Sequence, residues 1–401
     1  MDLTPVLLDW TNLALRWLHF IAGIAWIGSS FYFMALDASL KKAAGLPNGV
    51  SGETWQVHGG GFYRMWKYNV APPEMPKELT WFKWEAYTTL LSGLALLVVV
   101  YYLGAELYMI DPAKADLGPW TAAAIGIAVL VLGWIAYDAL CKSPLGQDQR
   151  VLALIGLIAF PLICLALDQV VTGRAAFLHV GALIGTIMVA NVAMIIIPNQ
   201  KKVVAALLAH EQPDPALGAQ AKQRSVHNNY LTLPVLFIMI SNHYPETFAS
   251  PLNWLILALV LVIGASIRHY FNIMHTGRNP PWWPWAVAVL GGLLAIWVAS
   301  FPATPPDPTA AAEPPPTFET VENVVLGRCS MCHAREPFWP GLAHAPKGVV
   351  LETPRDIRVH ARQIRAQAWQ THAMPPGNIT GIEPEERREL ARWVDAGAKV
   401  P

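Results

Sequence analysis

Long apolar stretches separated by shorter polar ones dominate the chain up to about residue 301. Eight of them are long and apolar enough to cross the hydrocarbon core of a membrane, which takes about 20 residues in a helix. The sixth is the most polar, because it begins with His227 and two asparagines and contains Pro234. The pattern predicts an all-α fold with a polytopic membrane domain over residues 1–301, whose helices lie at residues 12–36, 84–104, 119–140, 150–171, 175–198, 227–244, 252–272 and 282–301.

Composition agrees with this prediction. The chain is 54% hydrophobic and 14% charged, whereas about a quarter of the residues in a soluble domain are charged. Its 28 basic and 28 acidic residues cancel, so net charge gives no reason to expect a nucleic-acid partner. We therefore expect a lipid bilayer around most of the chain.

Basic residues are distributed unevenly between the predicted loops. The loops after odd-numbered helices hold twelve Lys and Arg, and the loops after even-numbered helices hold two, Lys114 and Arg174. Because basic loops stay on the cytoplasmic side, the odd-numbered loops, including a large one at residues 37–83, are predicted to be cytoplasmic. Both termini and everything after residue 301 are then expected outside.

The remainder of the chain has a different character. Residues 302–316 contain seven prolines, a composition that favours an extended, semi-rigid linker. Residues 317–401 mix basic and acidic residues and show helical periodicity over 354–370 and 384–396. We predict a small, separate C-terminal domain held outside the membrane.

This C-terminal domain contains the motif Cys329-Ser-Met-Cys332-His333. A C-x-x-C-H run is the attachment site of a c-type haem, with the two thiols bound covalently and the histidine as an iron ligand. A redox dithiol would leave His333 unexplained, and a zinc site would need a second Cys/His pair at suitable spacing. Haem c attachment takes place outside the cytoplasm, where the basic loops also place this domain.

A sixth iron ligand is expected from a methionine or a second histidine. Met374 is the best candidate, because it lies in a Pro/Gly-rich loop some forty residues after the motif, between the two predicted helices. The alternatives His372, His344 and His360 are interpreted as surface residues.

Several histidines lie within or beside the predicted spans, where ionisable groups are costly and usually functional. His19 and His179 are predicted at matched depth in the outer half of the membrane, so the two imidazoles could hold a non-covalent haem b. Hydrogen-bonded packing is the alternative for this pair. His227 and His269 are predicted at the cytoplasmic ends of their helices, the latter beside Arg268.

The predicted cytoplasmic loop at residues 37–83 is rich in aromatic residues and contains three consecutive glycines after His58. Ordered loops of this length are usually functional. We interpret it as a flap over a planar, anionic ligand, with Arg64 and Lys67 supplying positive charge. The alternative is a hairpin whose aromatic residues lie at the lipid headgroups.

Several blocks together resemble one family, the membrane-bound, cytochrome-c-fused urate oxidases (urate hydroxylases). These blocks are Leu18–Gly28, His58–Tyr63, Trp81–Tyr87, His227–Pro234, Ser241–Pro245, Arg268–Asn272 and the terminal C-x-x-C-H domain. The resemblance implies oxidation of urate to 5-hydroxyisourate in purine catabolism, at a bacterial inner membrane with both termini and the cytochrome domain periplasmic. Electrons would leave through haem c to a soluble cytochrome c or a terminal oxidase.

The resemblance also suggests roles for the residues above. His58, His227 and His269 are candidates for the base, since imidazole titrates near neutral pH, and Arg64, Lys67 or Arg268 would bind the anion. Because urate gives up two electrons and haem c accepts one at a time across the membrane, a haem b at His19 and His179 would be a useful intermediate. The alternative function is a membrane-anchored cytochrome c that relays electrons from quinol or another dehydrogenase.

Overall fold

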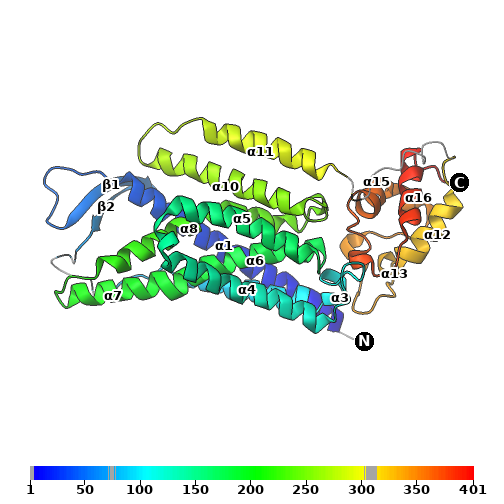
Figure 1. Cartoon of the computed structure of the whole chain (residues 1–401), viewed down its shortest axis with the longest axis horizontal. Coiled ribbons are helices and arrows are strands. Elements are labelled where there is room, and N and C mark those ends of the chain that lie inside the picture. Colours follow the sequence, from blue (N-terminus) through cyan, green and yellow to red (C-terminus); the bar gives the residue numbers. More distant parts are fainter. Residues whose placement is uncertain (1–3, 71, 73–75, 77, 302, 304–313) are drawn as a thin grey trace.

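The computed structural model describes residues 4–70, 72, 76, 78–301, 303 and 314–401. Helices occupy all eight apolar stretches (Figure 1). Two of these helices continue as π-helical turns, which are common at functional sites. The helices are α1 (Thr4–Ser39), α2 (Trp84–Leu96) continued by η1 (Leu97–Tyr102), α4 (Pro119–Lys142), α5 (Gln149–Asp168), α6 (Gly173–Ala190) continued by η3 (Asn191–Ile196) and α7 (Ile197–Leu208), α8 (Pro215–Ser241), α10 (Asn253–His275) and α11 (Trp283–Ala299).

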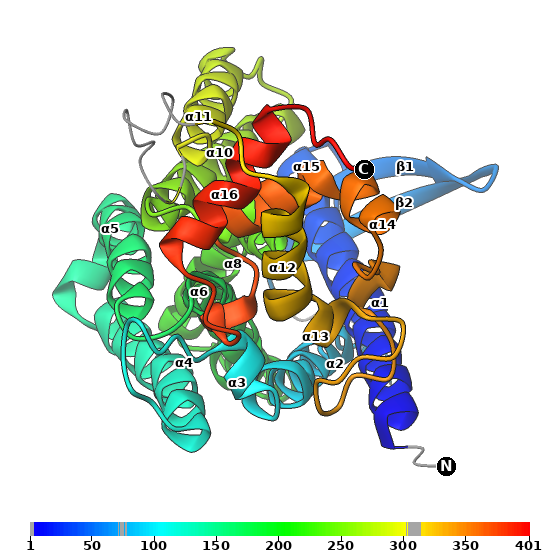
Figure 2. The same cartoon turned by 90° about the vertical axis from the view of Figure 1, so that its right-hand side faces the viewer.

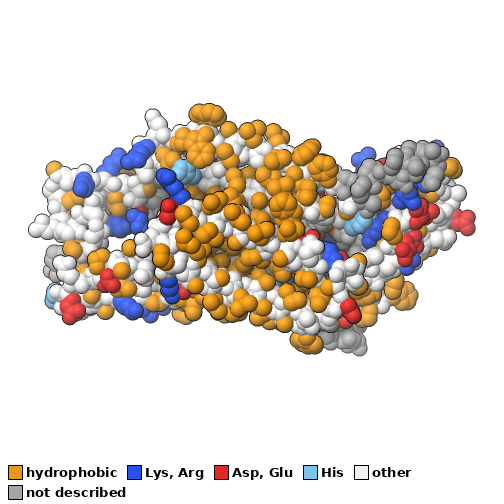
Figure 3. Space-filling view, in the orientation of Figure 1, with side chains coloured by type: hydrophobic (Ala, Val, Ile, Leu, Met, Phe, Trp, Pro, Cys, Tyr) orange, Lys and Arg blue, Asp and Glu red, His pale blue; other side chains and the backbone are white. Residues whose placement is uncertain are grey.

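Within the described residues, six helices are long and apolar enough to cross a membrane: Val6–Ser39, Trp84–Tyr102, Pro119–Lys142, Gln149–Asp168, Gly173–Leu208 and Asn253–His275. The two remaining predicted spans differ from these. α11 has only 17 residues, and the first half of α8 is polar. Apolar side chains cover the helical part of the visible face, while charged side chains gather towards its two ends (Figure 3). The chain thus has the features of a membrane protein, and the count of eight spans stays a prediction.

α6 lies at the centre of the bundle and packs against α4, α5 and α8. Twelve of its 18 residues are buried, which explains why its sequence is apolar on every side. α10 packs against α5, α8 and α11, and α1 packs along α2. Functional side chains can therefore meet where α8 faces α6 and where α8 faces α10.

The cytoplasmic loop predicted at 37–83 contains two antiparallel strands, β1 (Val50–His58) and β2 (Gly61–Tyr68). Gly59 and Gly60 connect them and both have positive φ, as a two-residue hairpin turn of type I′ requires. The hairpin projects away from the helices (Figure 2). The prediction of an all-α fold was therefore wrong for this segment, because its β-branched and aromatic residues flank a Gly-Gly turn.

The C-terminal domain is a separate helical unit with its own core of Val321, Val325, Leu390 and Trp393, among others. The two periodic segments predicted at 354–370 and 384–396 are helical. The elements are α12 (Phe318–Arg328), α13 (Ser330–His333), η5 (Pro346–Gly348), α14 (Pro354–Val359), α15 (Ala361–Ile364), η6 (Arg365–Gln370), η7 (Pro376–Asn378) and α16 (Pro384–Asp395). Most of the predicted linker at 302–316 lies outside the described residues.

The two ends of the bundle carry different elements. The C-terminal domain lies at the end where α1 begins, next to the short helix α3 (Ala105–Tyr108) (Figure 1). The hairpin and α7 lie at the opposite end. This arrangement groups the termini on one side, as the loop charges predict. We call the end with α3 the outer end and the end with the hairpin the inner end, following the predicted orientation.

Candidate functional site

His333 of the C-x-x-C-H motif is oriented as an iron ligand would be. Its Nδ1 lies 2.8 Å from the carbonyl oxygen of Val349. A protonated Nδ1 that donates to this carbonyl leaves Nε2 unprotonated, which is the form that binds a metal. The residues present therefore fit a c-type haem, with Cys329 and Cys332 as thioether anchors and His333 as the proximal ligand.

The two thiols do not have the environment of a reactive dithiol. Burial raises the pKa of Cys329 to about 12 and also raises the pKa of Cys332, whereas redox-active cysteines have lowered pKa values. Among the described residues, no group of three or more His, Cys, Asp or Glu is placed to hold a metal ion, and a structural zinc site needs four such ligands. Burial of the thiols thus differs from the environment of a redox dithiol.

Met374 is held at both of its backbone groups. Its N–H donates to the carbonyl of Gln367 at 3.0 Å, and its own carbonyl accepts from Arg387 Nη1 at 2.8 Å. Arg387 is buried and also donates to Asn378 and Ala368. This clamp fixes the loop of Met374, which supports Met374 as the second axial ligand and leaves that assignment a prediction.

In His19 and His179, as in His333, Nδ1 lies within hydrogen-bonding distance of a backbone carbonyl. The Nδ1 atom of His19 lies 3.0 Å from the carbonyl of Thr89, and that of His179 lies 2.8 Å from the carbonyl of Ala175. Each ring also faces a glycine that leaves it room: an added Cβ at Gly93 would lie 3.0 Å from His19, and one at Gly126 would lie 2.5 Å from His179 Nε2.

The two rings nevertheless contact different parts of the bundle. His19 lies against residues 89–93 of α2, whereas His179 lies against Tyr101 and Tyr102 of η1. These contacts are separated by a helical rise on the order of 10 Å. The prediction of matched depth is therefore wrong, because α1 is tilted and extends beyond the neighbouring helices (Figure 1). The pair as placed does not fit one shared haem b, and we assign no electron step to it.

The basic residues of the hairpin already have acidic partners. Arg64 forms an ion pair with Glu53 at 2.7 Å, and Lys67 forms one with Asp37 at 2.5 Å. His58 is exposed at the tip of the hairpin. None of the described contacts joins these three predicted site residues to Arg268. The hairpin is instead attached to α1, where the Tyr32 hydroxyl donates to Gln56.

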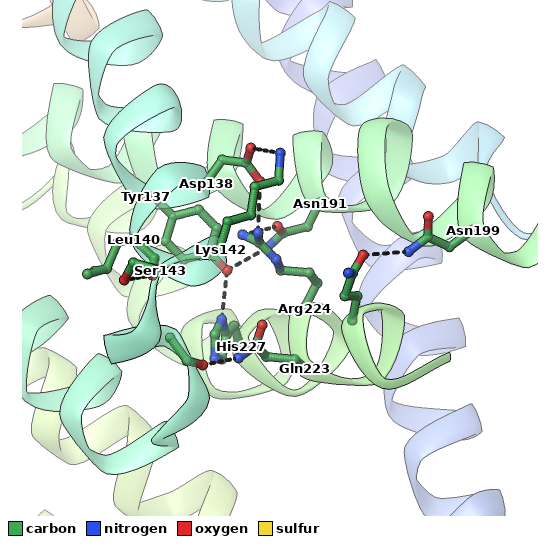
Figure 4. A network of polar contacts seen from close by, with 12 residues as sticks. Tyr137, Asp138, Leu140, Lys142, Ser143, Asn191, Asn199, Gln223, Arg224 and His227 are labelled. Atoms are coloured by element: carbon green, nitrogen blue, oxygen red, sulfur yellow. Dashed lines mark hydrogen bonds and ion pairs between the residues drawn. The ribbon is translucent and has the colours of Figure 1, made fainter. Parts of the chain in front are cut away.

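His227 belongs to a hydrogen-bonded chain near the middle of α8 (Figure 4). The prediction that it lies at the end of its helix was wrong, because the helix begins twelve residues earlier, at Pro215. Tyr137 accepts a hydrogen bond from Asn191 Nδ2 at 3.0 Å, so its hydroxyl is free to donate to His227 Nδ1 at 2.7 Å. The other ring nitrogen of His227 then donates to Gln149 Oε1 at 2.9 Å. These proton positions follow from the network rather than from observed hydrogens.

The same network contains a buried ion pair between Arg224 and Asp138 at 2.7 Å. Lys142 also donates to Asp138, and the Arg224 guanidinium lies over the ring of Tyr137. In the part of the chain that the structure describes, both ring nitrogens of His227 and both charges have partners. Breaking a buried, compensated pair of this kind is costly. We interpret the cluster as a structural one that holds α4, η3 and α8 together.

Arg268 lies in a second polar cluster, between α8 and α10, where the bonding is incomplete. Its Nη2 donates to Asn272 Oδ1 at 3.0 Å, and Asn272 in turn donates to Asn229 Oδ1 at 2.9 Å. The guanidinium carbon lies 3.8 Å from the centre of the Phe31 ring. Arg268 is 4% exposed and Asn229 is 0% exposed, so α1, α8 and α10 enclose the cluster from three sides.

Two N–H donors of this cluster, Arg268 Nε and Asn229 Nδ2, have no partner among the described residues although both atoms are buried. Leaving such groups unpaired costs about 1–3 kcal/mol each, so native proteins rarely tolerate them without a function. A positive charge and two unused donors beside an aromatic ring can bind a planar anion. Sequence reasoning identified Arg268 but missed Asn229, Asn272 and Phe31, although two of these lie in the motif blocks.

A second pair of contacts borders this α8–α10 cluster. Tyr230 follows Asn229 on α8, and its hydroxyl lies 3.0 Å from Nδ1 of His269, which follows Arg268 on α10. The ring of His269 also packs on Trp283 of α11. Of the three histidines predicted as the base, His269 is thus the one that lies beside Arg268.

Local sequence explains why α8 and α10 approach closely here. Pro234 has no N–H, so it cannot bond to the carbonyl of Tyr230, four residues earlier. Gly264 faces Pro234 so tightly that an added Cβ would lie 2.5 Å from the proline ring. The contact lies about one helical turn from Arg268 and from Tyr230, and it sets the separation of the two helices beside the cluster.

Comparison with known proteins identifies the family of the helical domain. A family model described as Urate oxidase N-terminal matches residues 5–299. The chain belongs to this family. No curated protein and no solved structure matches the chain. The urate oxidase match covers the whole helical domain with the α8–α10 cluster and ends before the C-x-x-C-H domain, so family membership describes a urate-related oxidoreductase with a small-molecule substrate.

Proposed function

We propose that this chain is a membrane-embedded oxidase that converts urate to 5-hydroxyisourate and delivers the electrons to a covalent haem c in its C-terminal domain. Membership of the urate oxidase family and the long apolar helices support the first part. The carbonyl-bonded His333 and the clamped Met374 support the second. The domain that binds urate and the domain that accepts electrons are then parts of one chain.

The observation that carries the proposal is the pair of unpartnered donors, Arg268 Nε and Asn229 Nδ2. Urate is planar and anionic at neutral pH, and its edge presents carbonyl oxygens and a ring nitrogen as acceptors. A charged donor and an amide donor on facing helices match such an edge, and charge-assisted bonds of this kind are the stronger ones. Phe31 adds an aromatic surface next to the guanidinium.

The reaction must remove two electrons and two protons from urate plus water. Arg268 would bind and orient the anion, and Asn272 would hold the guanidinium in place. His269, bonded to Tyr230 beside Arg268, would accept the proton of a ring N–H or of the water that adds at C5. When bound, haem c supplies a one-electron acceptor, so two successive transfers complete one turnover.

The same proposal includes the membrane that holds the chain and its orientation there. The loop charges support a bacterial inner membrane with the C-terminal domain in the periplasm, where a soluble cytochrome c or a terminal oxidase would accept the electrons. The inner end of the bundle, with the α8–α10 cluster nearer to it, would then face the cytoplasm, where urate is formed.

Anaerobic reduction of the purified protein tests the proposal without any quinol present. Urate should transfer one electron to haem c in each chain. With ferricyanide added as the final electron acceptor, it should yield one 5-hydroxyisourate for every two electrons passed on, whereas Arg268→Met should do neither at the same urate concentration. Reduction by quinol but not by urate would refute the oxidase and favour the relay from another donor. A pyridine haemochrome spectrum of the same sample shows whether haem b accompanies haem c.

A further inference from the structure

The C-terminal domain touches the helical bundle through the segment that contains Met374. Gly377 lies on the carbonyl group of Ile110, the residue that ends the α3 turn: a Cβ added at Gly377 would lie 2.2 Å from that oxygen. Ala373 packs against the core of the bundle. The predicted axial ligand is thus flanked on both sides by residues in contact with the membrane domain.

A third contact anchors the beginning of the same segment at the end of α11. The side-chain amide of Gln370 donates to the carbonyl of Ser300 at 3.0 Å. The backbone carbonyl of Gln370 accepts from the N–H of Ala303 at 3.0 Å. Residues 370–377 therefore meet the bundle at two separate places, next to α3 and next to α11. A segment held at two places has a defined orientation as well as a defined position.

Hydrogen bonds also fix the part of the bundle that Gly377 contacts, the turn that ends at Ile110. Thr172, the residue before α6, donates through its backbone N–H to the carbonyl of Met109 at 2.9 Å and through its hydroxyl to the carbonyl of Tyr108 at 2.6 Å. The Arg174 guanidinium lies 4.7 Å from the centre of the Tyr108 ring. The turn that ends at Ile110 is therefore attached to the central helix of the bundle.

We propose that the contact between Gly377 and Ile110 is a docking seat that directs the methionine side of the haem c site towards the membrane domain, so that electrons enter the C-terminal domain from this side. This inference rests on the proposed function, because it assumes that the electron donor lies in the membrane domain. Gly377 acts as a positioning residue. It is suited to this role because only a residue without a side chain lets the loop lie directly on the Ile110 carbonyl.

The chain offers a matched pair of variants. Gly377 and Gly381 both have positive φ, +56° and +64°, so an alanine at either position meets similar backbone strain. Only at Gly377 does the added Cβ meet the bundle, whereas at Gly381 the nearest atom is an arginine nitrogen 3.9 Å away. A Cβ at position 377 would lie 2.2 Å from the Ile110 oxygen, and ordinary contact begins at 3.4 Å. The loop of Gly377→Ala must therefore move about 1.2 Å away from Ile110.

The first measurement is hydrogen exchange of the peptides that cover residues 105–111 and 373–379. We expect both peptides to lose protection in Gly377→Ala and to keep it in Gly381→Ala, with equal amounts of covalent haem in the two variants. Equal exchange in the two variants would overturn the seat. This measurement does not depend on urate, so it distinguishes a failure of the seat from a failure of the proposed function.

The second measurement compares two reductants of haem c in stopped flow. Ascorbate reaches the C-terminal domain from solution, whereas urate reduces it only through the membrane domain. Because moving the haem c site away from the membrane domain lengthens the path for electron transfer, we expect Gly377→Ala to slow reduction by urate severalfold relative to Gly381→Ala, with ascorbate reduction unchanged. Equal slowing with both reductants would locate the damage in the haem site and overturn the proposed direction of electron transfer.

Discussion

Replacing Arg268 by methionine separates the ligand-binding role of this residue from a structural one. The change keeps most of the side-chain volume and removes the charge and the N–H donors. Hydrogen bonds to charged groups are worth about 1.5–3 kcal/mol, so losing one such bond to urate should weaken binding about 10- to 150-fold. The loss should be visible as a raised dissociation constant for urate.

The effect on stability without urate should be small, because two contributions oppose each other. Methionine removes the unpartnered Nε, which relieves about 1–3 kcal/mol. It also removes the stacking on Phe31, worth about 0.5–2 kcal/mol, and the bond to Asn272. We therefore expect the free energy of unfolding to fall by only about 1–2 kcal/mol, because the relieved cost offsets much of the loss.

Arg224→Met is the matched control, since Arg224 is as buried as Arg268 but fully paired with Asp138. Removing one partner of a buried ion pair costs about 3–5 kcal/mol, and we expect the lower end because Lys142 still neutralises Asp138. Unfolding followed by circular dichroism in detergent, with and without urate, measures both quantities. A ligand that binds only the folded state raises its stability.

The expected result is that urate stabilises the unaltered protein and Arg224→Met but no longer stabilises Arg268→Met. If Arg268→Met keeps its urate-dependent stabilisation, the α8–α10 cluster is not the urate site. If the free energy of unfolding of Arg268→Met instead falls by several kcal/mol without urate, the unpaired Nε of Arg268 does not cost the folded protein stability, and it gives no reason to place a ligand there.

Three further predictions concern other parts of the chain. Changing both Cys329 and Cys332 to alanine should abolish covalent haem, and haem staining that persists after denaturing electrophoresis would contradict the motif assignment. Met374→Ala should lower the haem midpoint potential, since a thioether ligand raises it; redox titration measures this, and an unchanged potential would exclude Met374 as a ligand. Hydrogen bonds from Trp66 and Arg64 lower the pKa of Glu53 below its ordinary value of 4.5. The contacts of Glu53 should therefore be intact above pH 4.5 and lost as the pH falls through the lowered pKa. A fluorotryptophan resonance at Trp66 that is unchanged at low pH would contradict this.

Local signals in the sequence accounted for much of the fold. Apolar stretches located a helix at each of the eight predicted positions, and six of these helices are long and apolar enough to cross a membrane. The C-x-x-C-H motif could be assigned as a candidate haem c site from sequence alone, since its residues are neighbours in the chain, and the assignment stays a prediction. Helical periodicity likewise located α14 to η6 and α16.

The polar site between helices could not be predicted in the same way. Arg268, Asn229 and Phe31 lie on three helices, and periodicity shows which face of a helix is polar without showing which helix it meets. The error over His19 and His179 has a related cause. Depth counted along the sequence assumes upright helices of equal length, whereas α1 has 36 residues and is tilted across the bundle (Figure 1).

The contact of Pro234 with Gly264 sets how closely α8 and α10 approach, and it would therefore limit the size of a ligand bound at the proposed α8–α10 site. The two residues lie a turn away from the donors, so neither needs to touch a ligand to set the width of the space available to it. A methyl group at position 264 would spread the two helices without altering any binding side chain. Replacements at this pair should therefore change the preferred ligand size while leaving the donor chemistry intact, so selectivity and affinity can be altered independently in this protein.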